Sequence, residues 1–310
     1  MSFILLGILN SQASGGGGGV AGYFAGGNDE NRVSTVNKFA FPTDERSTLG
    51  TGLSGVRDRL AGMANSSVAG YFGGGAVVTA TINKFAFPSD SRSTLGTGLS
   101  AARYYLAALA NAGVAGYFGG GANADTVSQS TVDKFAFPSD SRTTLGTGLS
   151  ASLQQNAGMA NSGVAGYFGG GGNGGAVATV NKFTFSSDSR STLGTGLSSS
   201  REALAAMANS SVAGYYAGGG PNFSGRVTTV DKFAFPSDSR STLGTGLSAA
   251  TNYFAGMADS GIAGYFGGGT TPSNVATVNK FAFPSDSRTT LGTGLSAARS
   301  DLAAMADEAL

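Results

Sequence analysis

One block of 46 to 50 residues is repeated six times along this chain. Each copy contains a Gly-Tyr-Phe step, or Gly-Tyr-Tyr in one copy, and these steps begin at Gly22, Gly70, Gly116, Gly166, Gly214 and Gly264. A fixed period in this range indicates a repeat architecture, in which each unit buries its apolar surface against its neighbours. The sequence therefore predicts one domain built from six equivalent units.

Each copy contains four short segments of β character separated by turn-forming residues. In the second copy these segments cover residues 60–64, 68–72, 81–87 and 93–100. Short strands at regular spacing are typical of all-β folds, and four strands in a unit of this length match the blade of a β-propeller. We therefore predict an all-β, six-bladed β-propeller with four strands per blade.

The alanine-rich first segment has a second interpretation, because LAALANAG at residues 106–113 could form a helical turn. Gly, Asn and Ser bracket this segment too closely for a stable helix. Small side chains also suit the innermost strand of a propeller, where six blades crowd around the axis. We assign the segment as that strand.

The third segment alternates with period 2, which places Phe85 and Phe87 on one face of the blade and Ile82, Lys84 and Ala86 on the other. Both faces of a blade are covered by other blades, so the Phe pairs should supply most of the large side chains buried between blades. The equivalent pairs are Phe39 and Phe41, Phe135 and Phe137, Phe183 and Phe185, Phe233 and Phe235, and Phe281 and Phe283.

The cycle of strands is cut after its first member. The first copy lacks a first segment, and residues 301–306 supply one that no further copy follows. We expect this C-terminal strand to pair into the first blade and to close the ring, which leaves only short sheet edges. The propeller then spans residues 20–310.

Composition excludes several classes of function. The net charge of +1 gives no electrostatic footprint for nucleic acid, and the absence of Cys excludes disulfides and thiolate metal sites. No apolar run is long enough to span a membrane. The 52 glycines are typical of a disordered chain, but 20 Phe and 10 Tyr recur in register, which indicates a packed core.

Residues 1–14 lie outside the repeat and carry the apolar run FILLGIL, and five glycines follow at positions 15–19. Consecutive glycines form a flexible joint. Residues 1–19 are therefore a candidate docking peptide with its linker, through which residues 1–14 would contact other structural proteins of an assembly. The alternative is that this apolar segment covers the propeller's own outer surface.

Recognition is expected between the second and third strands, where the copies differ most in length and composition. Examples are residues 122–130, 172–178, 221–227 and 270–276. These segments hold the same place in their repeats, so they should emerge on one face of the disk. Variable loops on a constant scaffold commonly carry binding, here to a host-surface glycan or a protein.

Charged residues recur at fixed positions of the repeat. They are the lysines Lys38, Lys84, Lys134, Lys182, Lys232 and Lys280, the arginines Arg46, Arg92, Arg142, Arg190, Arg240 and Arg288, and the aspartates Asp44, Asp90, Asp140, Asp188, Asp238 and Asp286. One interpretation is a charged ring that binds an anionic glycan or polymer. The other is structural: each Asp caps its own turn, and each Lys or Arg pairs with a nearby carboxylate. Duplication of the unit repeats any residue sixfold, which favours the structural interpretation.

No catalytic constellation stands out. GYFGGG follows a strand but leads into no helix, so it is not a dinucleotide-binding loop. The chain has no His and no Cys, and its acidic residues are mostly equivalent by repeat. The sequence therefore predicts a protein that is not an enzyme and has no catalytic residue, metal site or cofactor. General acid–base chemistry by an Asp and Tyr pair stays open.

The order GYFGGG, NKFAFPSDSR, TLGTGL and AAR resembles the kelch repeat, in which a strand ends in a double glycine, an aromatic strand follows and an Arg closes the unit. Gly74, Gly75, Phe87 and Arg103 match that pattern. Counterparts of Arg103 are Arg57, Arg201 and Arg299, whereas Leu153 and Thr251 stand there in two copies, and the kelch Trp is absent. The resemblance implies a galactose-oxidase-like propeller, but the copper site of galactose oxidase needs His and Cys, which this chain lacks.

The wording of GYFGGG and FAFPSDSR, with LLGILNSQ before the glycines, is also similar to virion-associated propeller proteins of marine and cyanobacterial phages. That resemblance implies a structural or adhesive component of a virion, in the tail, a fibre or the capsid surface. The alternative is a kelch-type protein-interaction scaffold in the cytoplasm or at the cell surface. A glycan-active enzyme is a distant third hypothesis.

Overall fold

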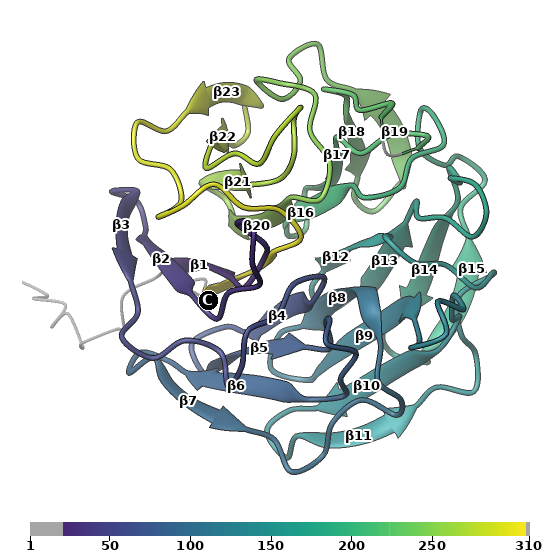
Figure 1. The fold of residues 1–310 in the computed structure, drawn as a ribbon. Helices are drawn as coiled ribbons and strands as arrows, with labels where there is room; N and C mark the ends of the chain where they lie inside the picture. The colour runs from purple at the N-terminus through teal and green to yellow at the C-terminus, as the bar shows by residue number, and fades with distance from the viewer. Residues whose placement is uncertain (1–20, 223, 308–310) are drawn as a thin grey trace, which may run out of the picture.

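The structure is a computed structural model that describes residues 21–222 and 224–307, and the segment 1–20 with its expected docking role lies outside these residues. The described chain forms six sheets of four antiparallel strands, arranged in a closed ring around an axis (Figure 1). The predicted six-bladed propeller with four strands per blade is confirmed.

The first strand of each blade lies at the axis, because it contacts the first strands of both neighbouring blades. These strands are β4 (Ala61–Asn65), β8 (Tyr104–Asn111), β12 (Ala157–Asn161), β16 (Ala205–Asn209), β20 (Ala255–Asp259) and β24 (Ala303–Asp307). Ala and Gly dominate them because the crowded axis leaves no room for large side chains. The strand interpretation of the alanine-rich segment is therefore confirmed.

Three further strands follow outward in each sheet. The second strands are β1 (Ala21–Ala25), β5 (Ala69–Gly73), β9 (Ala115–Ala122), β13 (Ala165–Gly169), β17 (Ala213–Ala217) and β21 (Ala263–Gly267). The third strands are β2 (Val36–Ala40), β6 (Ile82–Ala86), β10 (Val132–Ala136), β14 (Val180–Thr184), β18 (Val230–Ala234) and β22 (Val278–Ala282). The fourth strands are β3 (Glu45–Thr48), β7 (Ser91–Thr94), β11 (Ser141–Thr144), β15 (Ser189–Thr192), β19 (Ser239–Thr242) and β23 (Ser287–Thr290).

The ring closes as the sequence predicts. Strand β24 pairs antiparallel with β1, so that Ala303 lies opposite Ala25 and Asp307 lies opposite Ala21. The first blade is therefore the sheet β24-β1-β2-β3, made from both ends of the described chain.

The predicted position of the fourth strand is wrong. In the second blade this strand is β7, Ser91–Thr94, and not residues 93–100. The Pro-Ser-Asp turn reverses the chain at once, so that Ser91 already pairs with Ala86. Residues 95–100 instead form a connection that passes tightly against the inner part of the blade, since a Cβ at Gly98 would collide with the carbonyl oxygen of Ala80.

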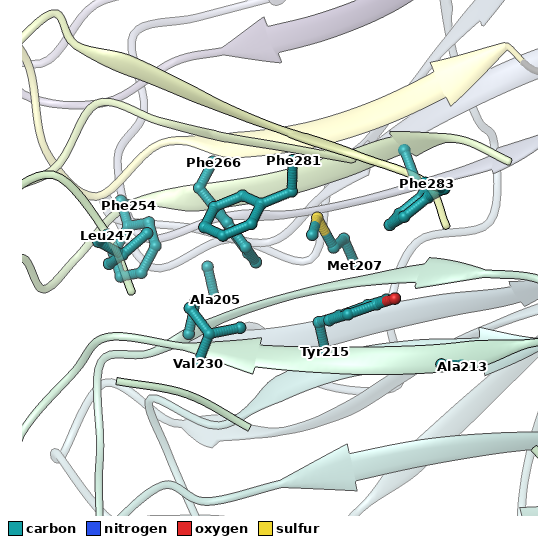
Figure 2. Close-up of a cluster of buried hydrophobic side chains, with 12 residues drawn as sticks. Ala205, Met207, Ala213, Tyr215, Val230, Leu247, Phe254, Phe266, Phe281 and Phe283 are labelled. Atoms are coloured by element: carbon teal, nitrogen blue, oxygen red, sulfur yellow. The ribbon is translucent and has the colours of Figure 1, made fainter. Parts of the chain in front are cut away.

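The core consists of six similar layers, one between each pair of neighbouring blades. Figure 2 shows the layer between the fifth and sixth blades, where Tyr215 stacks on Phe283 with ring centroids 5.4 Å apart. Met207 lies in the same layer and fits only because its neighbour is glycine: a Cβ at Gly264 would collide with its sulfur. Large side chains of one blade thus pack over small residues of the next.

The predicted faces of the third strand are confirmed in the second blade. Phe85 and Phe87 are buried in a layer with Met305 of the first blade. Ile82 is buried in the next layer, with Phe118 of the third blade. In the first blade, Phe41 is only partly buried, so its pair contributes less to the core than the others do.

Candidate functional site

The variable segments and the start of every first strand lie on the same face of the disk. In the second blade, Gly73 ends the second strand opposite Ala61, which begins the first strand. The other blades have the same register, so the variable segments surround the mouth of the central axis. We call this side the loop-bearing face.

Six residues, one from each blade, form a closed hydrogen-bonded ring at that mouth. Each donates its backbone N–H to the backbone oxygen of the corresponding residue in the neighbouring blade, over 2.6 to 2.9 Å. In order around the axis they are Arg59, Tyr105, Gln155, Ala203, Tyr253 and Asp301, and we call them the axial ring. The backbone is therefore the same in all six blades, although the side chains differ.

All six members of the axial ring have left-handed backbone, with φ between 55° and 59°. Glycine adopts this conformation at the lowest steric cost. The chain has 52 glycines and uses them at many other positive-φ positions, such as Gly74 and Gly75, yet none stands in the ring. Non-glycine residues in this region tend to cluster at functional sites, which makes the ring side chains the first candidates for function.

The ring side chains contact one another across the axis. Tyr105 and Tyr253 come from opposite blades, and their ring centroids lie 5.7 Å apart. Gln155 donates a hydrogen bond from Nε2 to the Tyr253 hydroxyl over 3.2 Å. On the other side, the Arg59 guanidinium lies 4.9 Å from the centroid of Tyr105. Together with the residues that follow them they line a hollow of about 420 Å³, part of which is open to solvent.

Asp301 is the acidic member of the ring. The Ser300 hydroxyl donates to its Oδ2 over 2.9 Å, whereas its Oδ1 is buried and accepts no hydrogen bond within the described chain. Burial raises the pKa of the Asp301 carboxyl to about 6, although the Ser300 hydrogen bond and the charge of Arg59 oppose the shift. Burial and the nearby Asp301 charge also raise the pKa of Tyr105 above its ordinary range.

The residue that follows the ring in each blade is Leu or Phe in five blades and Asn156 in the fourth. Asn156 is only 6% exposed, and neither its Oδ1 nor its Nδ2 has a hydrogen-bond partner in the described part of the chain. It lines the same hollow as the ring. An unsatisfied buried amide is costly, so an Asn at a position that is apolar in the other blades indicates a functional role for this residue.

The repeated lysines and aspartates lie between blades and contact each other. Each Lys donates to Asp in the turn of the next blade over 2.5 to 2.7 Å, as Lys84 does to Asp140. The same Asp accepts from a Tyr hydroxyl of the Lys-bearing blade over 2.7 to 2.9 Å, as Asp140 does from Tyr71. The lysines are thus paired with carboxylates, as the structural interpretation expected.

Two details of that interpretation are wrong. The aspartates bind the neighbouring blade instead of capping their own turns, as Asp140 does when it accepts from Lys84 over 2.6 Å. Four of the repeated arginines donate to the hydroxyl of the Thr two residues further along their own strand, as Arg190 does to Thr192, whereas Arg142 donates to the carbonyl oxygen of Gly98. Among the described residues, only Arg240 of this set lies within 4 Å of a carboxylate.

The closing arginines of the kelch-like pattern are buried within their own blades. Arg103 donates to the carbonyl oxygens of Gly120 and Thr131 and pairs with Asp133. In the first and second blades an Asn replaces that Asp, and burial lowers the pKa of Arg57 and of Arg299 to about 10. These arginines therefore hold the blade together and do not reach the loop-bearing face as free cations.

The axial ring was not singled out from the sequence, yet the sequence contained a signal for it. The two residues after the closing-arginine position read DR, YY, QQ, EA, NY and SD in successive copies. The words around them hardly change. Divergence at two adjacent positions inside a nearly constant repeat marks the ring without any structure.

Within residues 21–222 and 224–307, no group of three His, Cys, Asp or Glu side chains is arranged to hold a metal ion. The described chain also contains no helix that is long and apolar enough to cross a membrane.

No protein-family model matches the chain, and no curated protein sequence matches it. Among solved structures, the chain is similar to one titled "Structure of YjhT", with a TM-score of 0.67, 13% sequence identity, and coverage of 80% of this chain and 87% of that chain. At so low an identity the similarity shows the fold alone: this chain is a six-bladed β-propeller.

Proposed function

We propose that this protein is a non-enzymatic adhesive propeller, a component of a phage virion that binds a host-surface glycan or protein through its loop-bearing face. The observation that carries the proposal is the place of sequence divergence. Contacts inside the fold, such as those of Lys84 and Asp140, recur in all six blades, whereas the variable segments and the axial ring differ from blade to blade. Divergence on one face of a constant scaffold is typical of a recognition surface.

The entry point of the chain supports an anchoring role for residues 1–14. Strand β1 begins at Ala21, opposite Asp307, and ends with Ala25 at the loop-bearing face. Ala21, the first described residue, therefore lies at the face of the disk opposite the loop-bearing face. An anchor there would leave the variable loops directed away from the assembly, and the glycines at 15–19 would let the disk reorient.

The second candidate is a glycan-active enzyme, and one observation favours it. Asp301, with its raised pKa, lies in the same ring as Tyr105, and a carboxyl of pKa about 6 suits a general acid. The adhesive proposal expects no turnover of any bound glycan, so release of reducing sugar by the purified protein would favour the enzyme. A kelch-type scaffold in the cytoplasm or at the cell surface shares the geometry of the adhesive protein and differs only in location.

The location of the protein is tested by mass spectrometry of purified particles of the phage whose genome encodes this chain. Peptides recovered together with tail or capsid proteins support the virion, and their absence from intact particles contradicts it. Removal of residues 1–14 should then leave a disk with an unchanged melting temperature that no longer co-sediments with particles.

Adhesion is tested by exchanging one variable segment for another of equal length. Replacing residues 270–274, TTPSN, with GNGGA from residues 172–176 keeps the backbone bridge that both segments form. The variant should still join particles but bind host cells more weakly. Unchanged host binding after exchange of every variable segment would contradict a role for this face.

A further inference from the structure

The axial ring carries unlike groups on a backbone that is the same in all six blades. Its members include a cation, an anion, an amide, two phenols and one methyl group. The cation is Arg59, the anion is Asp301, the amide is Gln155, the phenols are Tyr105 and Tyr253, and the methyl group belongs to Ala203. Because the backbone there accepts Ala203 as readily as tyrosine, the fold itself does not demand the large side chains. Their presence calls for an explanation other than closure of the ring.

Within the described chain, two buried side chains that line this hollow have polar atoms without a hydrogen-bond partner. Oδ1 of Asp301 is a strong acceptor without a donor, and the amide of Asn156 offers both a donor and an acceptor without a partner. Leaving such groups unsatisfied is costly, and a ligand with hydroxyl groups would offset that cost. A hydroxyl suits both, because it donates and accepts.

Three aromatic side chains, those of Tyr105, Tyr253 and Phe254, line the hollow together with four leucines. Tyr105 and Tyr253 lie side by side across the axis, and Gln155 donates a hydrogen bond to the hydroxyl of Tyr253. Ala203, the one small residue of the ring, also lines the hollow. Aromatic faces with a few oriented polar groups are what a concave site presents to a ligand that has both C–H surfaces and hydroxyls.

The charges of the ring oppose each other. Arg59 contributes one positive charge to the lining of the hollow and Asp301 one negative charge. Asp58, whose Oδ2 lies 3.9 Å from the Arg59 Nε, is not part of that lining, and its Oδ1 pairs with the Nε of Arg32 over 3.1 Å. The hollow therefore offers no excess of either sign to attract a charged ligand. Its chemistry favours a neutral molecule rich in hydroxyl groups.

We propose that the hollow above the axial ring binds a single neutral sugar residue, which stacks on the tyrosines and exchanges hydrogen bonds with Asp301 and Asn156. This inference rests on the proposed function in one respect, namely that the loop-bearing face is the face that meets ligands. It narrows that function to a carbohydrate, either free or at the end of a longer glycan.

Binding is measured by isothermal titration and saturation-transfer NMR on the full chain, with the methyl glycosides of glucose, galactose, mannose and N-acetylglucosamine as probes. At least one should bind, and Asn156→Leu, Tyr105→Ala and Asp301→Asn should each weaken it about tenfold or more. All three substitutions suit the backbone, because Leu and Ala occupy the equivalent places in other blades and Asn tolerates left-handed φ. The control is Val164→Ala, an exposed position outside the hollow, which should leave affinity unchanged.

Two results would overturn the proposal: no binding of any probe, or binding that survives all three substitutions. Either would identify the ring as a plug that closes the axis. A second arm uses soluble polysaccharides that end in the same sugar, since equal affinity for both indicates recognition of the terminal residue alone. The loop exchange at 270–274 is scored separately on host cells, so adhesion through the loops can hold even where the sugar site fails.

Discussion

The Lys–Tyr–Asp contacts between blades and the axial ring occupy six equivalent positions each, and they differ in what the chain has kept there. Asp140 and Tyr105 have nearly the same backbone, with φ of 55° and 56°. The first position is Asp in every blade, and the second carries five residue types in six blades. At the first position the side chain completes a contact between blades, and all six copies of the unit have retained it.

This difference separates structural from functional repetition. A sixfold ring of charges first attracts attention as a binding site, yet each Lys of that ring already has a carboxylate partner and is only about one fifth exposed. The divergent ring has no conserved charge but contains unpartnered buried atoms. In a propeller of near-identical blades, loss of symmetry is therefore the better indicator of function.

The largest expected effect comes from removing the element that serves both regions. Deletion of residues 299–310 removes β24, which closes the first blade, and Asp301, which completes the ring. The opened blade exposes an unpaired edge, so the protein should aggregate or unfold well below the melting temperature of the full chain. Deletion of residues 308–310 alone is the control, and size-exclusion chromatography with thermal melting compares the two. Equal melting temperatures would show that ring closure contributes little.

The next effect concerns the repeated core. Phe85→Ala should lower the free energy of unfolding by about 3 to 5 kcal/mol, because the phenyl group of Phe85 is fully buried between blades. Phe135→Ala and Phe233→Ala should lose the same amount, since their layers are equivalent. Urea denaturation of the three variants measures this, and a loss below about 1 kcal/mol at Phe85 would place its strand outside the core.

The third prediction uses pH to address the ring alone. The pKa of Asp301 is about 6 in the folded chain and near the ordinary 3.8 in the unfolded chain. Between these values the folded state keeps a proton that the unfolded state has lost, so stability falls as pH rises from about 4 to 6 and is regained as pH falls. The total change is about 2 to 3 kcal/mol. Urea denaturation of the native chain and Asp301→Asn at several pH values should show a steeper fall of stability in the native chain.

Other carboxyls contribute to that slope with the same sign. Burial also raises the pKa of Glu202, Asp259 and Asp307. The test is therefore the difference between the native chain and Asp301→Asn at each pH. Parallel curves for the two proteins would mean that Asp301 does not titrate in this window.

A smaller loss is expected for the contact between blades. Asp140→Asn keeps an acceptor for Tyr71 and tolerates left-handed φ, but it removes the charge that pairs with Lys84. Partly buried pairs of this kind contribute about 1 to 2 kcal/mol. Asp238→Asn should give the same result, and Asp125→Asn in an exposed loop serves as the control. If the loss of unfolding free energy differed twofold between Asp140→Asn and Asp238→Asn, the six contacts would not be equivalent.

The fold was predictable because every blade contains the same pattern of strand-forming and turn-forming residues. Six copies of Gly-Tyr-Phe fixed the blade number, and the lone segment at 301–306 fixed the closure. The fourth strand was misplaced because Thr and Gly after Ser93 have strand-like composition, whereas the turn before Ser91 decides where pairing starts.

The candidate site was harder to predict because its residues meet only in three dimensions. Arg59 and Asp301 are more than two hundred positions apart in the sequence, yet they are hydrogen-bonded neighbours in the ring. The two residues hold the same position in the repeat, but no local sequence pattern predicts a left-handed φ at a tyrosine. The partner of each Lys likewise lies in the next blade, which repeat equivalence alone does not reveal.

The smallest predicted effect has the opposite sign and tests the comparison most directly. Asn156→Leu introduces the residue that four other blades carry at this place, so the new side chain should fit the layer between the third and fourth blades as Leu106 fits the layer before it. It removes two unpartnered polar atoms and adds buried apolar surface, which should raise the free energy of unfolding by about 1 kcal/mol. Leu204→Asn, the reverse change at the equivalent position of the fifth blade, should lower it. A gain in stability at Asn156 combined with weaker sugar binding would identify a residue kept for function at the expense of the fold, whereas a loss of stability would show that Asn156 supports the fourth blade itself.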